Sequence, residues 1–227
     1  METAFGVEVE DAALLIANPA EKFAGVEIVA VILEPLATAD VLAEDEVLAA
    51  RGLILRPADA VEVAECWELA LSEKTRPTVM ALSRQAVPTI RGASKDNLCA
   101  KGAYVLSEPA KGKAKAVIVA TGSEVQLALA AQKLLADEGV KVRVVSMPST
   151  NVFDRQDKDY KKSVLPKGLP RVAVEMGVTD FWWKYGVDAV VGIDTFGESA
   201  PAPVLFKHFG FTPENVAATV KAVLKKK

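Results

Sequence analysis

The sequence predicts an α/β protein in which an open, mostly parallel sheet with helices on both faces follows a smaller, partial α/β unit. Two observations support this class. Short β-branched apolar runs alternate with amphipathic segments along the 227 residues, which is typical of parallel strands joined by helical crossovers. Hydrophobic residues make up 51% of the chain and charged residues 25%, enough apolar material to bury a sizeable core.

The partial unit is expected over residues 1–85. Its run EIVAVIL is β-branched and apolar after the first residue, as a buried strand requires, and Pro35 ends it. Residues 1–50 carry eleven acidic residues and one basic residue, so this acidic head differs in charge from the rest of the chain. The expected elements are a strand over 27–33, a helix over 41–50, a strand over 53–55, a helix after Asp59 and a strand over 77–82.

Residues 86–113 are expected to be a linker between two domains. Proline and glycine punctuate this stretch, and only residues 103–106 resemble a strand. The punctuating residues are Pro88, Gly92, Gly102, Pro109 and Gly112.

Residues 114–227 are expected to form a complete α/β domain of ordinary size. Residues 116–120 (AVIVA) favour a fully buried strand, and the segment after Thr121 turns into a helix that runs to about Glu138. The remaining elements are strands over 140–146, 171–175 and 189–192 and a helix over 214–224, which Pro213 opens.

Composition excludes several function classes. No apolar run approaches the roughly 20 residues of a membrane span, and no basic stripe with interleaved aromatics indicates nucleic-acid binding. Two cysteines and a single histidine provide neither a disulfide framework nor a metal-ligand cluster. We therefore expect a cytoplasmic protein that binds no membrane and no nucleic acid.

Arg84 is the foremost candidate for ligand binding. It directly follows the strand expected over 77–82, and open α/β sheets bind ligands at the carboxyl ends of their strands. A guanidinium suits phosphate because it offers paired N–H donors and a permanent charge. An ordinary interdomain salt bridge is the alternative, and position alone does not separate the two.

Gly122 and Ser123 form a weaker candidate for an anion site. They place a glycine and a hydroxyl at the start of a helix that follows a strand, where backbone N–H groups point outward. The simpler interpretation, which we favour, is that Ser123 caps its helix and Gly122 makes the turn.

The other reactive residue types are expected to be structural. His208 has no adjacent carboxylate or nucleophile, and Cys66 lies on the apolar side of its helix. The aromatic group around Trp182 favours a core or a subunit interface over a stacking platform. Glu175 ends a strand but has no recognisable partner. No residue is assigned a catalytic or metal-binding role.

Eight short blocks stand in order along the chain from about residue 53 to the end. They are LRPADA at 55–60, ALSRQ at 81–85, GAYVL at 102–106, ATGSEV at 120–125, RVVSMPS at 143–149, SVLP at 163–166, FGESAPA at 196–202 and FGFT at 209–212. Together they resemble the C-terminal part of transketolase, whereas residues 1–50 match nothing in that family.

The resemblance implies a homodimeric, thiamine-diphosphate-dependent transferase that moves a two-carbon ketol unit between sugar phosphates. It makes residues 53–85 the tail of a pyrimidine-binding domain and 114–227 the C-terminal domain. Arg84 matches the arginine that contacts the sugar phosphate in the family. The family's Gly-Asp-Gly metal motif, its Asp-Gly-Pro-Thr-His segment and its activating glutamate have no counterpart in the chain.

From these matches and departures we expect a C-terminal portion of a transketolase that supplies a phosphate-binding arginine and dimer surface. We expect no cofactor on this chain alone, although thiamine diphosphate and magnesium belong to the complete enzyme. A homodimer, or a separate chain carrying the cofactor domain, would then be its partner. The alternative is a non-catalytic interaction or regulatory module derived from a truncated transketolase.

Overall fold

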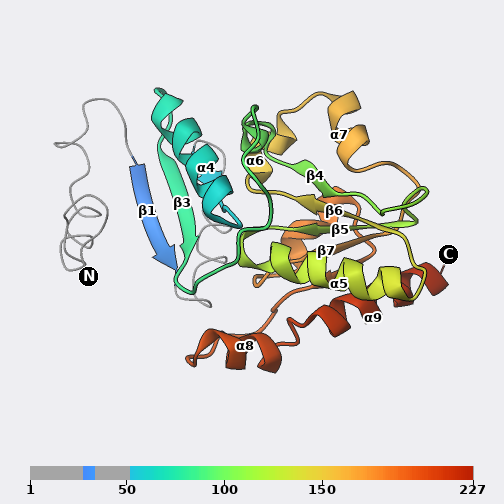
Figure 1. Cartoon of the computed structure of the whole chain (residues 1–227). Helices are drawn as coiled ribbons and strands as arrows, with labels where there is room; N and C mark the ends of the chain where they lie inside the picture. The colour runs from blue at the N-terminus through green and yellow to red at the C-terminus, as the bar shows by residue number, and fades with distance from the viewer. Residues whose placement is uncertain (1–27, 34–51, 227) are drawn as a thin grey trace.

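The computed structural model describes residues 28–33 and 52–226 (Figure 1). Within them, eight strands form two sheets, and helices flank both. The helix predicted over 41–50 and most of the acidic head lie outside the described residues. The α/β class predicted from the sequence is confirmed.

The smaller sheet is parallel and has the order β1-β3-β2. Its strands are β1 (Ile28–Leu33), β2 (Leu53–Leu55) and β3 (Thr78–Ser83), and α4 (Ala60–Ser72) connects β2 to β3. The N-cap of α4 is Asp59, whose side chain accepts a hydrogen bond from the Glu62 N–H at 2.8 Å. Buried side chains of β2, α4 and β3 pack against one another and against Cys99.

The larger sheet has the order β4-β6-β5-β7-β8, with β4 antiparallel and the other strands parallel. Its strands are β4 (Tyr104–Ser107), β5 (Ala116–Ala120), β6 (Val142–Ser146), β7 (Arg171–Val174) and β8 (Ala189–Val191). The central strand β5 is buried along its whole length, which explains why its sequence is apolar without alternation.

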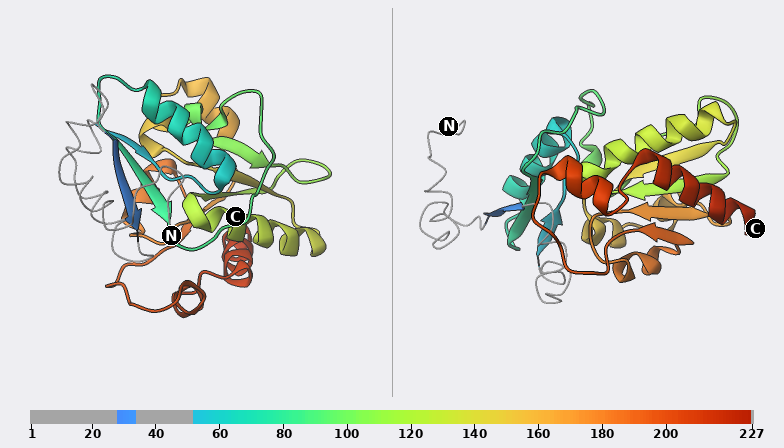
Figure 2. Two further views of the ribbon diagram at one scale, coloured as in Figure 1. Left: turned by 60° about the vertical axis from the view of Figure 1, so that its left-hand side comes forward. Right: turned by 90° about the horizontal axis from the view of Figure 1, so that it is seen from below.

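Two apolar cores cover the two faces of the larger sheet. Ile118 of β5 faces α5 (Val125–Asp137) and α9 (Pro213–Lys225), which lie side by side on one face (Figures 1 and 2). Val119, the next residue, faces the other core, which holds buried side chains of α6 (Thr150–Asp154), α7 (Lys158–Val164) and η4 (Asp180–Tyr185). The period of two along the strand therefore divides its side chains between the cores.

The remaining described elements are short. They are the 3₁₀ turns η2 (Leu98–Lys101) and η3 (Gly122–Glu124) and the helix α8 (Ala202–His208). None of the helices in the described part of the chain is long and apolar enough to cross a bilayer.

Residues 86–113, expected to be a linker, contain η2 and β4, and β4 pairs with β6 in the larger sheet. That sheet therefore begins before residue 114 and has one strand more than the four expected in the domain from 114 onward. The division into 1–85, 86–113 and 114–227 stays a prediction.

Candidate functional site

Arg84 lies at the carboxyl end of β3, as the sequence predicts. The strand ends at Ser83, and the Arg84 side chain that follows is exposed. The turn η3 contacts β3, so the structure brings the segment holding Gly122 and Ser123 toward the smaller sheet. The anion-binding role of all three residues stays a prediction.

Gly122 and Ser123 are already engaged within the chain. The Gly122 N–H donates to the backbone carbonyl of Arg56 at 3.2 Å, and Gly122 adopts φ +56°, which suits glycine in this turn. The Ser123 hydroxyl donates to Glu124 Oε1 at 2.6 Å and does not cap α5, whose N-cap residue is Glu124. Ser123 was expected to be the cap, but the sequence could not show that a 3₁₀ turn precedes the helix.

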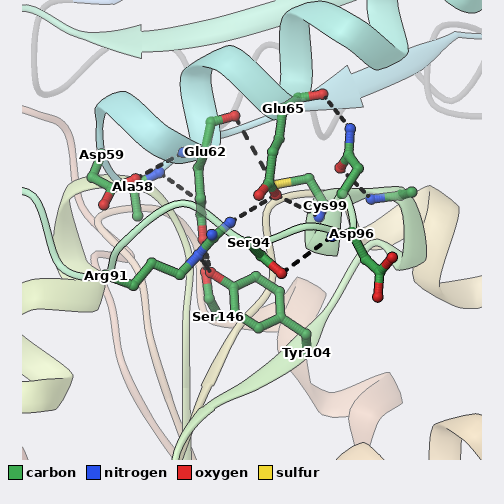
Figure 3. A network of polar contacts seen from close by, with 12 residues as sticks. Ala58, Asp59, Glu62, Glu65, Arg91, Ser94, Asp96, Cys99, Tyr104 and Ser146 are labelled. Atoms are coloured by element: carbon green, nitrogen blue, oxygen red, sulfur yellow. Dashed lines mark hydrogen bonds and ion pairs between the residues drawn. The ribbon is translucent and has the colours of Figure 1, made fainter.

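Two polar clusters, neither of them foreseen as such, join the two sheets. The first centres on Glu62 of α4 (Figure 3). Glu62 Oε1 accepts hydrogen bonds from the Tyr104 hydroxyl at 2.7 Å and from the Ser146 hydroxyl at 2.6 Å. Glu62 Oε2 accepts one from the Ala58 N–H at 2.7 Å. One carboxyl group of the smaller unit thus binds strands β4 and β6 of the larger sheet.

Arg91 extends this first cluster. Its Nε donates to the Tyr104 hydroxyl at 2.8 Å, and its guanidinium pairs with Glu65 at 2.7 Å (Figure 3). The Cys99 N–H also donates to Glu65, at 3.0 Å. Glu65 follows Glu62 by three residues, so the two carboxyl groups lie on the same face of α4. The loop over residues 91–99 is held against α4 in this way.

The pKa values of the two glutamates in this cluster are shifted in opposite directions. Desolvation raises the pKa of Glu62, although the Ser146, Tyr104 and Ala58 hydrogen bonds act against it. Burial alone would also raise the pKa of Glu65, but hydrogen bonds from Arg91 and Cys99 lower it. Burial raises the pKa of the Tyr104 hydroxyl, which therefore stays protonated and donates to Glu62. The cluster is a structural network, because both Glu62 oxygens and one Glu65 oxygen accept hydrogen bonds from other residues of the chain.

The second cluster lies beyond the ends of β2, β5 and β7. Arg56 forms an ion pair with Glu175, whose second oxygen accepts a hydrogen bond from Trp182 Nε1 at 2.6 Å. Glu124 lies close enough to Arg56 to feel its charge. Burial raises the pKa of Glu124 to about 7, against the opposing effects of the Ser123 hydrogen bond and of Arg56.

These positions settle some, but not all, of the sequence-based interpretations. Trp182 is buried in a core, as expected, and Cys66 is buried and free. Glu175 was expected to lack a partner; it has two, because the fold brings Arg56 and Trp182 to it. The Asp-x-x-Glu spacing that ends at Glu62 indicates a helix start, but it does not reveal that this glutamate reaches the other sheet.

The described residues do not fit the metal and diphosphate of a thiamine cofactor. Among residues 28–33 and 52–226, no group of three or more His, Cys, Asp and Glu side chains is placed to hold a metal ion. The glycine turn that could face a phosphate donates its N–H to Arg56 instead.

Comparisons with known proteins agree with this fold. Residues 102–212 match the transketolase-like TK C-terminal domain family. Transketolase 2 of Vibrio parahaemolyticus is 50% identical over 173 residues, and Transketolase 1 of Escherichia coli is 50% identical over 174 residues. Each match covers 74% of this chain and 26% of the relative, so the chain spans about a quarter of the length of those enzymes.

Solved structures give the same result. The transketolase from Leishmania mexicana matches with a TM-score of 0.74 and 42% identity, over 82% of this chain and 27% of that one. A transketolase from Pichia stipitis, in complex with sedoheptulose 7-phosphate, matches with a TM-score of 0.75 and 38% identity, over 85% of this chain and 27% of that one. A split-gene transketolase chain shares the fold at a TM-score of 0.62 and 24% identity, over 77% of this chain and 58% of that one. The chain therefore corresponds to the C-terminal region of transketolases.

Proposed function

We propose that the chain acts as the C-terminal part of a transketolase-type ketol transferase that uses thiamine diphosphate and acts on sugar phosphates. The 50% identity to curated transketolases carries this proposal. Two free, buried cysteines agree with a reducing compartment such as the cytoplasm. The chain would contribute Arg84 to the substrate site and a part of the subunit interface, as a homodimer or with a separate cofactor-domain chain.

Arg84 is proposed to bind the phosphate of the substrate. Its side chain is exposed just beyond β3, so a ligand at the carboxyl edge of the smaller sheet can reach it. Its planar guanidinium offers a phosphate two parallel donors, which the point charge of a lysine cannot.

Activity on its own is not part of the proposal. The described residues provide no metal cluster, and the motifs that hold the cofactor in transketolases have no match in the sequence. Titration calorimetry with thiamine diphosphate and magnesium should therefore show only weak binding to the isolated chain. Magnesium-dependent binding at micromolar affinity would show that the chain holds its own cofactor site.

The decisive experiment mixes the chain with the cofactor-binding remainder of a transketolase and compares phosphorylated with unphosphorylated sugars. Loss of one charge-assisted hydrogen bond costs roughly 1.5–3 kcal/mol, so Arg84→Ala should reduce kcat/KM for the phosphorylated sugars by about 10- to 150-fold. Arg84→Lys should recover part of that loss. Arg76→Ala, at the other end of β3 and paired with Glu73, is the matched control.

The substrate comparison decides the role of Arg84. A loss that is equal on phosphorylated and free sugars would identify Arg84 as a structural residue. If no complementing chain restores activity to the unaltered protein, the non-catalytic module becomes the better description.

A further inference from the structure

One residue of the smaller unit meets the ends of three parallel strands of the larger sheet. The Arg56 N–H donates to the carbonyl of Pro148, which follows β6, at 2.7 Å. The Arg56 carbonyl accepts from the N–H of Gly122, which follows β5, at 3.2 Å. The Arg56 guanidinium pairs with Glu175, which follows β7. Arg56 thus contacts this edge of the sheet through its backbone and through its side chain.

The acceptor for the Arg56 guanidinium is the Glu175 carboxylate, which is already held in place within the larger sheet. Glu175 is 5% exposed, and its Oε2 accepts a hydrogen bond from Nε1 of the fully buried Trp182 at 2.6 Å. A carboxylate buried to this extent needs a cation partner to offset its desolvation. Arg56, with 20% of its side chain exposed, supplies that cation from another part of the fold.

Neighbouring residues of the same segment are held in the same way. The Ser149 hydroxyl donates to the Ile54 carbonyl at 2.7 Å, and Asn151 Nδ2 donates to the Gly52 carbonyl at 2.8 Å. The Ala58 side chain is part of the apolar core around β5. Residues 52–58 therefore lie along the carboxyl edge of the larger sheet.

In open α/β sheets this edge is where ligands bind. We propose that Arg56 is an internal ligand of the larger sheet: its backbone binds the ends of β5 and β6, and its guanidinium fills an acceptor site at Glu175, just beyond β7. The site takes a cation, in contrast to the anion considered for Gly122 and Ser123. The inference goes beyond the proposed function, because it requires neither cofactor nor substrate.

Chemical rescue tests this assignment on the full chain. Arg56→Ala should lower the Tm by roughly 5–10 °C, because it leaves a buried carboxylate without its partner. Millimolar ethylguanidinium, well below denaturing concentrations, should restore part of the loss, whereas ethylammonium should restore less because it lacks the planar pair of donors. Arg76→Ala removes a partly exposed arginine paired with Glu73 and should show neither effect.

Two further variants keep the proposal falsifiable if Arg56→Ala does not fold. Arg56→Lys should retain part of the stability. Glu175→Gln, which keeps an oxygen for the Trp182 N–H, should abolish the difference in Tm between arginine and lysine at position 56. Ethylguanidinium that raises the Tm of Arg56→Ala no more than that of Arg76→Ala would overturn the proposal. The proposal would also be overturned if Arg56→Lys changed the Tm by the same amount in the unaltered chain and in the Glu175→Gln variant.

Discussion

Buried carboxyl groups set the pH response at the scale of single residues. Glu62 and Glu124 both have a raised pKa, because the chain removes each from water. The pKa of Glu124 in the folded state is about 7, against an ordinary value of 4.5. Between these two values the folded state binds more protons than the unfolded state, so stability falls as the pH rises from about 4.5 to 7 and levels off above.

Glu124→Gln should remove the part of this pH dependence that Glu124 contributes. Each pKa unit corresponds to 1.36 kcal/mol, so at pH 8 the substitution should relieve up to about 3 kcal/mol of destabilisation relative to pH 4.5, an upper limit that hydrogen-bond losses will reduce. Urea unfolding at several pH values measures the difference. Glu198→Gln, at an exposed glutamate, should leave the pH profile unchanged. An unaltered profile in Glu124→Gln would assign the pH response to another group.

At the scale of elements, the turn from η2 into β4 depends on Gly102. Gly102 has φ +78°, and an added Cβ would lie 2.2 Å from the Phe153 backbone nitrogen and 2.4 Å from the Ser149 carbonyl oxygen. These are backbone atoms of α6 and its N-cap, which cannot move aside as a flexible side chain would.

Gly102→Ala should therefore destabilise the fold by at least about 2 kcal/mol, through backbone strain together with steric overlap. Gly168→Ala is the matched control, because Gly168 has φ +84° but no atom within 4 Å of an added Cβ. Denaturant unfolding of both variants separates strain from overlap. Equal losses would show that the close approach to α6 contributes nothing.

Local patterns predicted most of the elements, but not the contacts between them. β2 and β5 begin and end where their apolar runs do. The helix α7 was not foreseen, because its sequence KDYKKSV is mostly polar and only Val164 is fully buried. Amphipathic periodicity is too weak over seven residues to indicate such a helix.

In the candidate site too, local sequence predicted the position of a residue but not the contacts between distant residues. Arg84 could be placed at a strand end because its neighbours in sequence form that strand. The hydrogen bond from Ser146 to Glu62 joins residues 84 positions apart, and that from Tyr104 joins residues 42 apart. Arg56 likewise acquires its role from residues distant in the sequence, which no local pattern encodes.

On the scale of the whole molecule, β4 belongs to the larger sheet although it precedes residue 114. It pairs with β6, and the Ser107 hydroxyl donates to Gln132 of α5 at 2.8 Å. Without β4, the edge of β6 would expose unpaired backbone groups, which favours association with other chains.

A truncated chain of residues 102–227 should therefore unfold at a higher temperature than one of residues 114–227, and it should stay monomeric to higher concentration. Calorimetry and sedimentation of the two chains provide the comparison. If the two chains had the same unfolding temperature and the same tendency to associate, β4 would contribute nothing, and the domain predicted over residues 114–227 would be complete in itself.

The contacts of residues 52–58 also have a consequence for the order of events during synthesis. Ile54 and Gly52 are bound by residues 95 and 99 positions later in the chain, so both leave the ribosome well before their partners exist. At about 5–20 residues per second, this delay lasts roughly 5–20 seconds. For that time the Ile54 and Gly52 carbonyls lack the partners that they have in the folded protein, so this segment can take its final place only after residue 151 has been synthesised.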